Sequence, residues 1–97
     1  MPTYISLLRW SQKGFEDIKD SPARLDLAKK AIKKAGGKMT TFLMTMGQYD
    51  MVVITEAPDE EVLAKVMLAI GSAGGVRSET LRAFTESEYR KIIASLP

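Results

Sequence analysis

Four polar side chains in this sequence could act together on a small molecule: Tyr49, Asp50, Glu79 and Arg82. A tyrosine hydroxyl can serve as a general acid or a hydrogen-bond donor when a carboxylate or a guanidinium lies close to it. We therefore take these four residues as candidates for proton transfer on an apolar acid or ketone. In this interpretation Tyr49 and Asp50 line a pocket or reach a partner subunit, and Glu79 and Arg82 lie at the pocket mouth.

Each of these residues also has a purely structural interpretation. Gly47 can adopt a positive φ, and Asp50 can accept backbone N–H groups within a tight turn. Glu79 and Arg82, together with Arg77, can serve only to keep the edge of a sheet charged, which prevents strand-to-strand aggregation. The sequence leaves both interpretations open.

Arg24 is a further candidate for ligand binding. It follows Pro22 in the first turn of a predicted helix, where a cation opposes the helix dipole. Pairing with the carboxylate of Asp20 or Asp26 would compensate for this. The functional alternative is an anionic ligand bound beside the helix N-terminus.

Aromatic and basic residues are the last group with possible binding roles. Trp10 and Tyr4 share one face of the first predicted strand, where they either pack in a core or dimer interface or form a stacking platform for a ligand. Lysines crowd the end of the first long helix, where cations are favourable and solvated. The third predicted strand lacks the Lys/Arg-Gly-Phe type of run that RNA-binding domains use, so we expect no nucleic acid partner.

The composition narrows the chemistry that is open to the protein. The sequence has 97 residues with neither cysteine nor histidine, so disulfides, thiolate metal sites and the commonest general base are excluded. A net charge of +2 is too small to indicate nucleic acid or anionic membranes. The start of the chain lacks the features of a signal peptide, and no apolar run is long enough to span a bilayer. We expect one cytoplasmic domain over residues 1–97 that uses no metal and no cofactor.

The periodicity of apolar residues predicts an α+β fold. Strands are expected at residues 3–10, 39–46, 51–55 and 76–84, the last one at a sheet edge because it is more polar. Ser21 is expected to cap the first long helix, Pro58 opens the second, and Thr85 with Glu88 forms a capping box for a terminal helix at 86–96. With right-handed crossovers, this order gives a four-stranded antiparallel sheet with both long helices on one face.

Both faces of this sheet are predicted to be apolar. In the second strand Phe42, Met44 and Met46 are expected on one face, and Met39 and Leu43 on the other. Helices can cover only one face, and a bare second face would exceed the apolar surface that monomers tolerate. We therefore expect two copies to pack their sheets together, about 10 Å apart. The alternative is that the terminal helix folds over the bare face within one chain.

The sequence also resembles a known family. The Gly-Gln-Tyr-Asp run at 47–50, followed by Met-Val-Val-Ile at 51–54, is similar to the signature of the GYD-domain family. Other stretches resemble that family in the same order: Ser-Pro-Ala-Arg at 21–24, Gly-Gly at 36–37, Pro-Asp at 58–59 and Ser-Glu-Thr-Leu-Arg-Ala-Phe at 78–84. The resemblance implies a ferredoxin-like βαββαβ domain of the dimeric α/β-barrel type, and little about activity.

Three functions remain open at this point. The first is a homo-oligomeric domain that binds a small apolar or weakly acidic organic molecule in a Met-rich cavity, with Tyr49, Asp50, Arg24, Arg82 and Trp10 as candidate contacts. The second is a cofactor-free enzyme, monooxygenase- or isomerase-like by analogy with other dimeric barrels, that uses Tyr49, Asp50 and Arg82. The third is a purely structural assembly unit.

Overall fold

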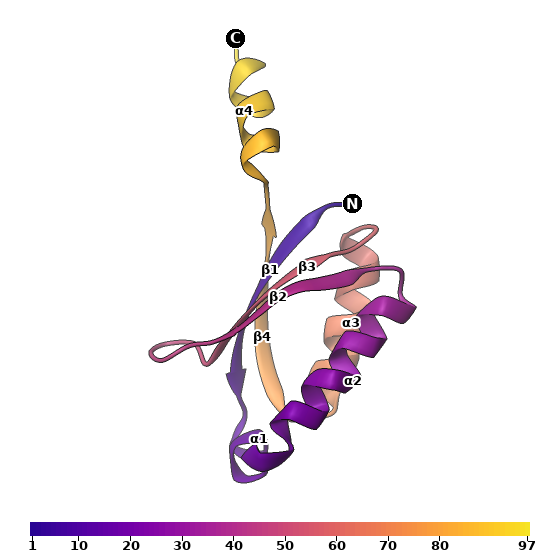
Figure 1. The fold of residues 1–97 in the computed structure, drawn as a ribbon, viewed down its shortest axis with the longest axis vertical. Coiled ribbons are helices and arrows are strands. Elements are labelled where there is room, and N and C mark those ends of the chain that lie inside the picture. Colours follow the sequence, from indigo (N-terminus) through magenta and orange to yellow (C-terminus); the bar gives the residue numbers. More distant parts are fainter.

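The chain folds into an antiparallel sheet with two long helices against one side, and a terminal helix stands apart from both (Figure 1). The computed structural model describes all 97 residues. The elements are β1 (Thr3–Trp10), α1 (Gln12–Glu16), the short 3-10 helix η1 (Ile18–Asp20), α2 (Ser21–Lys34), β2 (Lys38–Met44), β3 (Met51–Glu56), α3 (Glu60–Ser72), β4 (Val76–Ala83) and α4 (Glu86–Ala94).

The strand order β2-β3-β1-β4 confirms the predicted ferredoxin-like βαββαβ topology. All three strand pairs are antiparallel. β4 lies at one edge of the sheet, as its polar character predicted. The register pairs Leu8 with Met51 and Thr3 with Ala83, so the β2–β3 hairpin and the end of β4 lie at opposite ends of the sheet.

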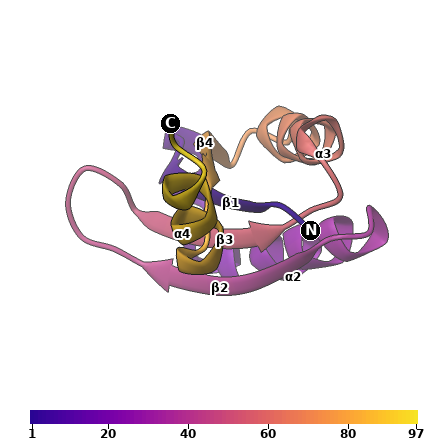
Figure 2. The ribbon, with the colours of Figure 1, turned by 90° about the horizontal axis from the view of Figure 1, so that it is seen from above.

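The side of the sheet that faces the helices holds the core. Tyr4 and Leu8 of β1 are buried there, as are Met51 and Val53 of β3. Because side chains alternate along a strand, Ser6 and Thr55 share this face and are also buried. α2 adds Ile32 and α3 adds Leu63, and both side chains are buried. Figure 2 shows the two helices lying over the same face.

A β-bulge in β2 overturns one expectation about its faces. Met39 was expected to lie opposite Phe42, but the register shifts between Met39 and Thr41. The extra residue makes Met39 face the helices together with Phe42, because each bulge reverses the alternation of side chains beyond it. Both side chains therefore contribute to the space between the sheet and α2.

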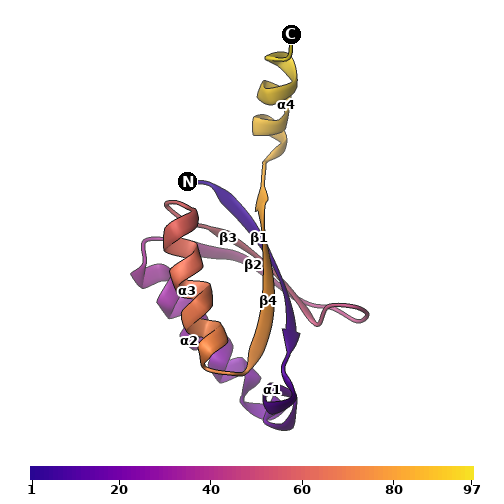
Figure 3. The ribbon, with the colours of Figure 1, turned by 180° about the vertical axis from the view of Figure 1, so that it is seen from behind.

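The opposite side of the sheet has an apolar centre, as predicted. We call it the open face, and it carries six apolar side chains: Ile5, Leu7, Leu43, Val52, Ile54 and Leu81. The charged residues Arg9, Glu56 and Glu79 lie around this centre. α4 does not fold over it: in Figures 1 and 3 the helix projects away from the end of β4. The alternative in which the terminal helix covers this face is therefore not what the chain adopts.

Three local signals gave mixed results. The capping box of Thr85 and Glu88 is present at the start of α4. The apolar periodicity did not predict the short helix α1, which Ser11 caps. The expected tight turn at 47–50 is part of a longer loop, because β2 ends at Met44 and the loop closes through a 2.8 Å bond from Thr45 N to the Asp50 carbonyl.

Candidate functional site

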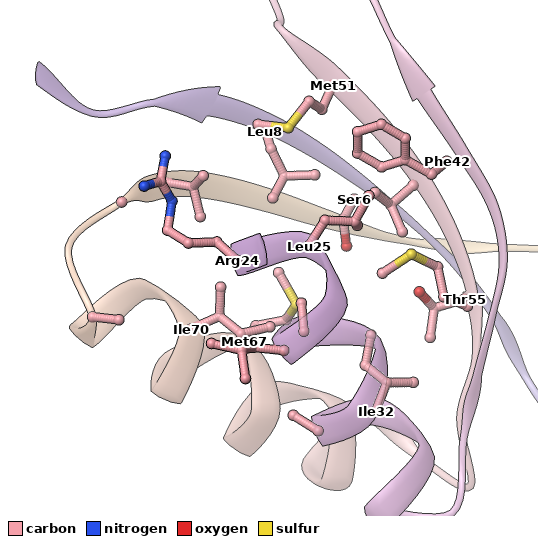
Figure 4. A pocket seen from close by; sticks show the side chains of 18 of the residues that line it. Ser6, Leu8, Arg24, Leu25, Ile32, Phe42, Met51, Thr55, Met67 and Ile70 are labelled. Carbon is pink, nitrogen blue, oxygen red and sulfur yellow. The ribbon is translucent and has the colours of Figure 1, made fainter. Parts of the chain in front are cut away.

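A cavity of about 310 Å³ lies between α2, α3 and the helix-facing side of the sheet (Figure 4). Fifteen of its twenty lining residues are hydrophobic. The lining residues are Ser6, Leu8, Ser21, Arg24, Leu25, Leu27, Ala28, Ala31, Ile32, Met39, Phe42, Met51, Val53, Thr55, Met67, Ala69, Ile70, Ala73, Gly75 and Val76. Its size and apolar lining are typical of sites for small organic ligands.

Small side chains on the helices explain why this space is not filled. α2 faces the cavity with Ala28 and Ala31, and α3 contributes Ala69. Each alanine leaves a gap where a leucine would reach the sheet. Met39 and Met67 line the remaining wall with flexible side chains that can adapt to an irregular ligand.

The polar groups of the cavity are few, and most have partners within the chain. The Ser6 and Thr80 hydroxyls are 2.9 Å apart, and the Ser21 hydroxyl accepts a 3.2 Å hydrogen bond from the Trp10 indole. Thr55 is 1% exposed, and its hydroxyl points toward the cavity in Figure 4. A ligand would therefore meet an apolar surface with one hydroxyl on its floor and a charge at one end.

That charge belongs to Arg24. Its guanidinium donates to the carbonyl of Asp17 at 3.2 Å and to that of Gly14 at 3.1 Å. The prediction that Arg24 pairs with the carboxylate of Asp20 or Asp26 is therefore wrong, because two backbone carbonyls accept hydrogen bonds from the guanidinium instead. A guanidinium has five N–H donors, so donors remain for a ligand.

A backbone junction holds Arg24 in this place. Ser11 N donates to the Gly75 carbonyl at 3.1 Å, and the Ser11 hydroxyl donates to the Gly74 carbonyl. The backbones approach so closely that a Cβ on Gly14 would lie 1.9 Å from the Gly75 oxygen. The Arg24 side chain also passes beside Gly75. The junction thus joins α1 and the start of β4 around the charged end of the cavity.

The start of α2 differs from the prediction in a way that affects this site. Asp20 occupies the N-cap position without a side-chain cap bond, and Ser21 is the first helical residue. The Ser21 hydroxyl is engaged by Trp10 instead of by the helix backbone. Trp10 also packs beside Leu8 in the core, which agrees with the packing interpretation of this residue.

The 47–50 segment forms a second polar site, away from the cavity. The Asp50 carboxylate accepts a 3.0 Å bond from Trp10 N, and Asp50 N donates to the Leu8 carbonyl at 2.9 Å. These bonds extend the contact between β1 and the loop, which favours the structural interpretation of Asp50. Gly47 has a φ of +132°, a conformation that suits glycine.

Tyr49 and Glu79 meet at the margin of the open face. The Tyr49 hydroxyl donates to the Glu79 carboxylate at 2.9 Å. Arg9 lies over the Tyr49 ring, 4.8 Å from its centroid, and donates to the Gln48 carbonyl at 2.7 Å. The hydrogen bond to Glu79 raises the pKa of Tyr49, so this hydroxyl stays protonated at neutral pH and keeps its proton for the bond to Glu79.

Arg82 does not join this pair, and the expected four-residue constellation is not formed. Glu79 and Arg82 are three residues apart on one strand, so their side chains lie on opposite faces. Arg82 donates to the Thr3 carbonyl at 3.2 Å and lies 3.7 Å from Glu60 and 3.9 Å from Glu88. It serves as a bridge between the start of α3 and the start of α4.

Arg9 is the residue of this site that the sequence analysis missed. It is far from Tyr49 in the sequence, and only the pairing of β1 with β3 brings the two together. The alternation along β1 was available as a signal, because it placed Arg9 on the same face as Ile5 and Leu7.

Neither metal ligands nor membrane segments stand out in the structure. No group of three or more aspartate, glutamate, histidine or cysteine residues is placed to hold a metal ion. None of the helices combines the length and the apolar character needed to cross a membrane.

Comparison with known proteins places this geometry in context. The sequence model of the GYD domain matches residues 4–93. The glutamine synthetase and cystathionine beta-lyase binding protein of Thermus thermophilus is 31% identical over 84 residues, which are 86% of this chain and 88% of that protein.

Two solved structures share the fold. TTHA0845 from Thermus thermophilus has a TM-score of 0.56 and 29% identity, with 88% of this chain and 95% of that chain covered. The feast or famine regulatory protein from M. tuberculosis, complexed with L-methionine, has a TM-score of 0.65. At 14% identity this second likeness concerns the fold alone, and the match spans 88% of this chain and 51% of that protein.

Proposed function

The chain belongs to the GYD domain family, and from this premise we propose that it is a cytoplasmic, homodimeric binding module for a small apolar organic molecule with a weakly acidic group. The observation that carries the proposal is the apolar cavity with Arg24 fixed at one end. The apolar part of the ligand would lie against Met39, Phe42 and Met67. Its anionic group would take the free N–H donors of Arg24, in a geometry suited to a carboxylate or sulfonate.

Two fluorescent probes that differ in one charged group test this proposal. Anilinonaphthalene sulfonate carries an anion on an apolar aromatic body, and N-phenylnaphthylamine is its neutral counterpart. Arg24→Met should lower the affinity for the anionic probe about tenfold or more, since a hydrogen bond to a charged group contributes roughly 1.5–3 kcal/mol. The neutral probe should bind wild type and variant alike, which controls for folding. Equal loss of both probes, or no loss of either, would contradict the role of Arg24.

The open face supports the homodimeric part of the proposal. Its apolar centre has no cover within the chain, and a second copy of the same sheet offers a matching surface. Leu7 lies near the middle of this face. Leu7→Glu should convert a dimer to a monomer in sedimentation velocity, and a wild-type monomer at high micromolar concentration would refute the pairing.

A second candidate function is the binding of a metabolic enzyme. It is favoured by the Thermus relative, which is described as binding glutamine synthetase and cystathionine beta-lyase. Surface plasmon resonance with these two purified enzymes tests it directly. An unrelated enzyme of similar charge is the control, and equal responses from all three would dismiss the idea.

The catalytic alternative gains no support from the geometry. Tyr49 and Glu79 lie together, but the protonated tyrosine has no base beside it other than this carboxylate. Arg82 lies on the other face of β4.

A further inference from the structure

The chain exposes more surface than a compact monomer of its size. Its accessible surface is 6856 Å², whereas a compact monomer of 10.7 kDa exposes about 5,500 Å². The radius of gyration is 14.6 Å, against about 12.5 Å expected for this length. The excess of about 1,300 Å² resembles the area that one subunit hides in a stable dimer.

Two projections account for this extended shape. One is α4, and the other is the β2–β3 hairpin around residues 45–50 (Figures 1 and 3). The hairpin projects on the side away from α2 and α3, and its Met46 is 95% exposed. Because the two projections lie at opposite ends of the sheet, a two-fold axis across the strands brings α4 of one copy to the hairpin of the other.

α4 carries an apolar stripe that nothing in its own chain covers. Tyr89, Ile92 and Ile93 recur at helical spacing, and Leu96 follows just after the end of the helix; the four side chains are between 44% and 62% exposed. The opposite side of the helix carries Lys91. A stripe of this kind on a helix that stands clear of the body needs a partner.

α4 is nevertheless held at a fixed angle. The capping box fixes its first turn, and Arg82 lies 3.9 Å from Glu88 and 4.5 Å from the centroid of the Phe84 ring. Arg82 is in turn anchored to the Thr3 carbonyl and beside Glu60. A helix that is already ordered loses less entropy when it docks than a flexible tail would.

The available areas favour a second copy as the partner. The six apolar side chains of the open face are only partly exposed: Leu43 is 54% and Leu81 is 44% exposed, and the other four are half-buried. They fall short of the roughly 800 Å² that a standard interface hides on each partner. The α4 stripe and Met46 of the hairpin enlarge the apolar surface toward that size.

We propose that α4 is an exchanged arm, whose apolar stripe packs against Met46 on the hairpin of a second copy. The inference rests on the pairing of open faces proposed above. Methionine suits this role because its flexible side chain adapts to an opposing helix. The exchange occurs twice in each dimer, so both projections of both chains become covered.

Charge substitutions on α4 test whether this helix contributes to the dimer in addition to the pairing of the open faces. Ile92→Glu should raise the dimer dissociation constant at least about 100-fold, because each dimer contains two such contacts. Lys91→Glu on the opposite side of α4 should change it less than about threefold. Leu68→Glu is a matched control, because Leu68 is 74% exposed on α3 and lies outside the proposed interface.

Crosslinking then tests proximity, helped by the absence of native cysteine. Mixed Ile92→Cys and Met46→Cys chains should form an intermolecular disulfide quickly, and Lys91→Cys with Met46→Cys should not. If Leu7→Glu dissociates the dimer while Ile92→Glu does not, the arm is refuted and the sheet pairing stands. Equal crosslinking rates for positions 91 and 92 would also refute the arm. A monomeric wild type would overturn both proposals.

Discussion

Filling the cavity from α2 gives the most direct check on its existence. Ala28 lines it, so Ala28→Leu would place about three additional carbon groups in space that is otherwise empty. Burial of each contributes about 0.8 kcal/mol, and ordering the leucine side chain opposes this by about 0.5–1 kcal/mol. The free energy of unfolding should therefore rise by about 1.5–2 kcal/mol. For a domain of this length, that corresponds to an increase in Tm of about 6–15 °C.

The assay combines thermal unfolding, followed by circular dichroism, with binding of both naphthalene probes. Ala28→Leu should raise Tm and abolish binding of the charged and the neutral probe together. Ala23→Leu is the control, because Ala23 is on the same helix but exposed and outside the cavity. If both variants unfold at the same temperature and Ala28→Leu still binds the probes, the space between α2 and the sheet is not the binding site.

Further predictions concern the supports of the two sites. Asp50→Ala leaves the Trp10 N–H without its acceptor and should lower the free energy of unfolding by about 1–3 kcal/mol in urea titrations; an unchanged midpoint would remove Asp50 from the architecture. Gly14→Ala must push the backbone of α1 away from that of Gly75, so the free energy of unfolding should fall by about 1–3 kcal/mol and the anionic probe should bind more weakly. The hydrogen bond from the Thr85 backbone lowers the pKa of Glu88, so its contribution to α4 is present above the ordinary glutamate pKa and disappears as the pH falls below about 4. Carbon chemical shifts of α4 should then move toward coil values, and full helicity at low pH would contradict this.

Local signals in the sequence were sufficient for most of the fold. The strand and helix order, the polar edge strand and the capping box at Thr85 follow from patterns within a few residues of one another. The faces of β2 could not be predicted, because the bulge before Thr41 has no clear signature in the sequence. The face of Arg82 could have been predicted. Glu79 and Arg82 are an odd number of positions apart on one strand, so their side chains must lie on opposite faces of the sheet.

The candidate site was harder to predict because it depends on distant contacts. Ala28 and Ala31 reveal a cavity only when the sheet and α3 are in place around them. Likewise, the partners of Arg24 are backbone carbonyls, which every sequence contains and no sequence pattern marks. Arg9 reaches the loop of Tyr49 through strand pairing. Chemistry-bearing residues could thus be named from the sequence, but their neighbours could not.

The single tryptophan gives the molecule a built-in optical reporter. Trp10 closes β1 and is tethered by its indole to the first residue of α2, so its emission depends on whether that helix rests on the sheet. A motion that separates the start of α2 from the end of β1 must break this tether and expose the ring to solvent. Emission wavelength and quenching by acrylamide would therefore follow that separation in real time, without a label.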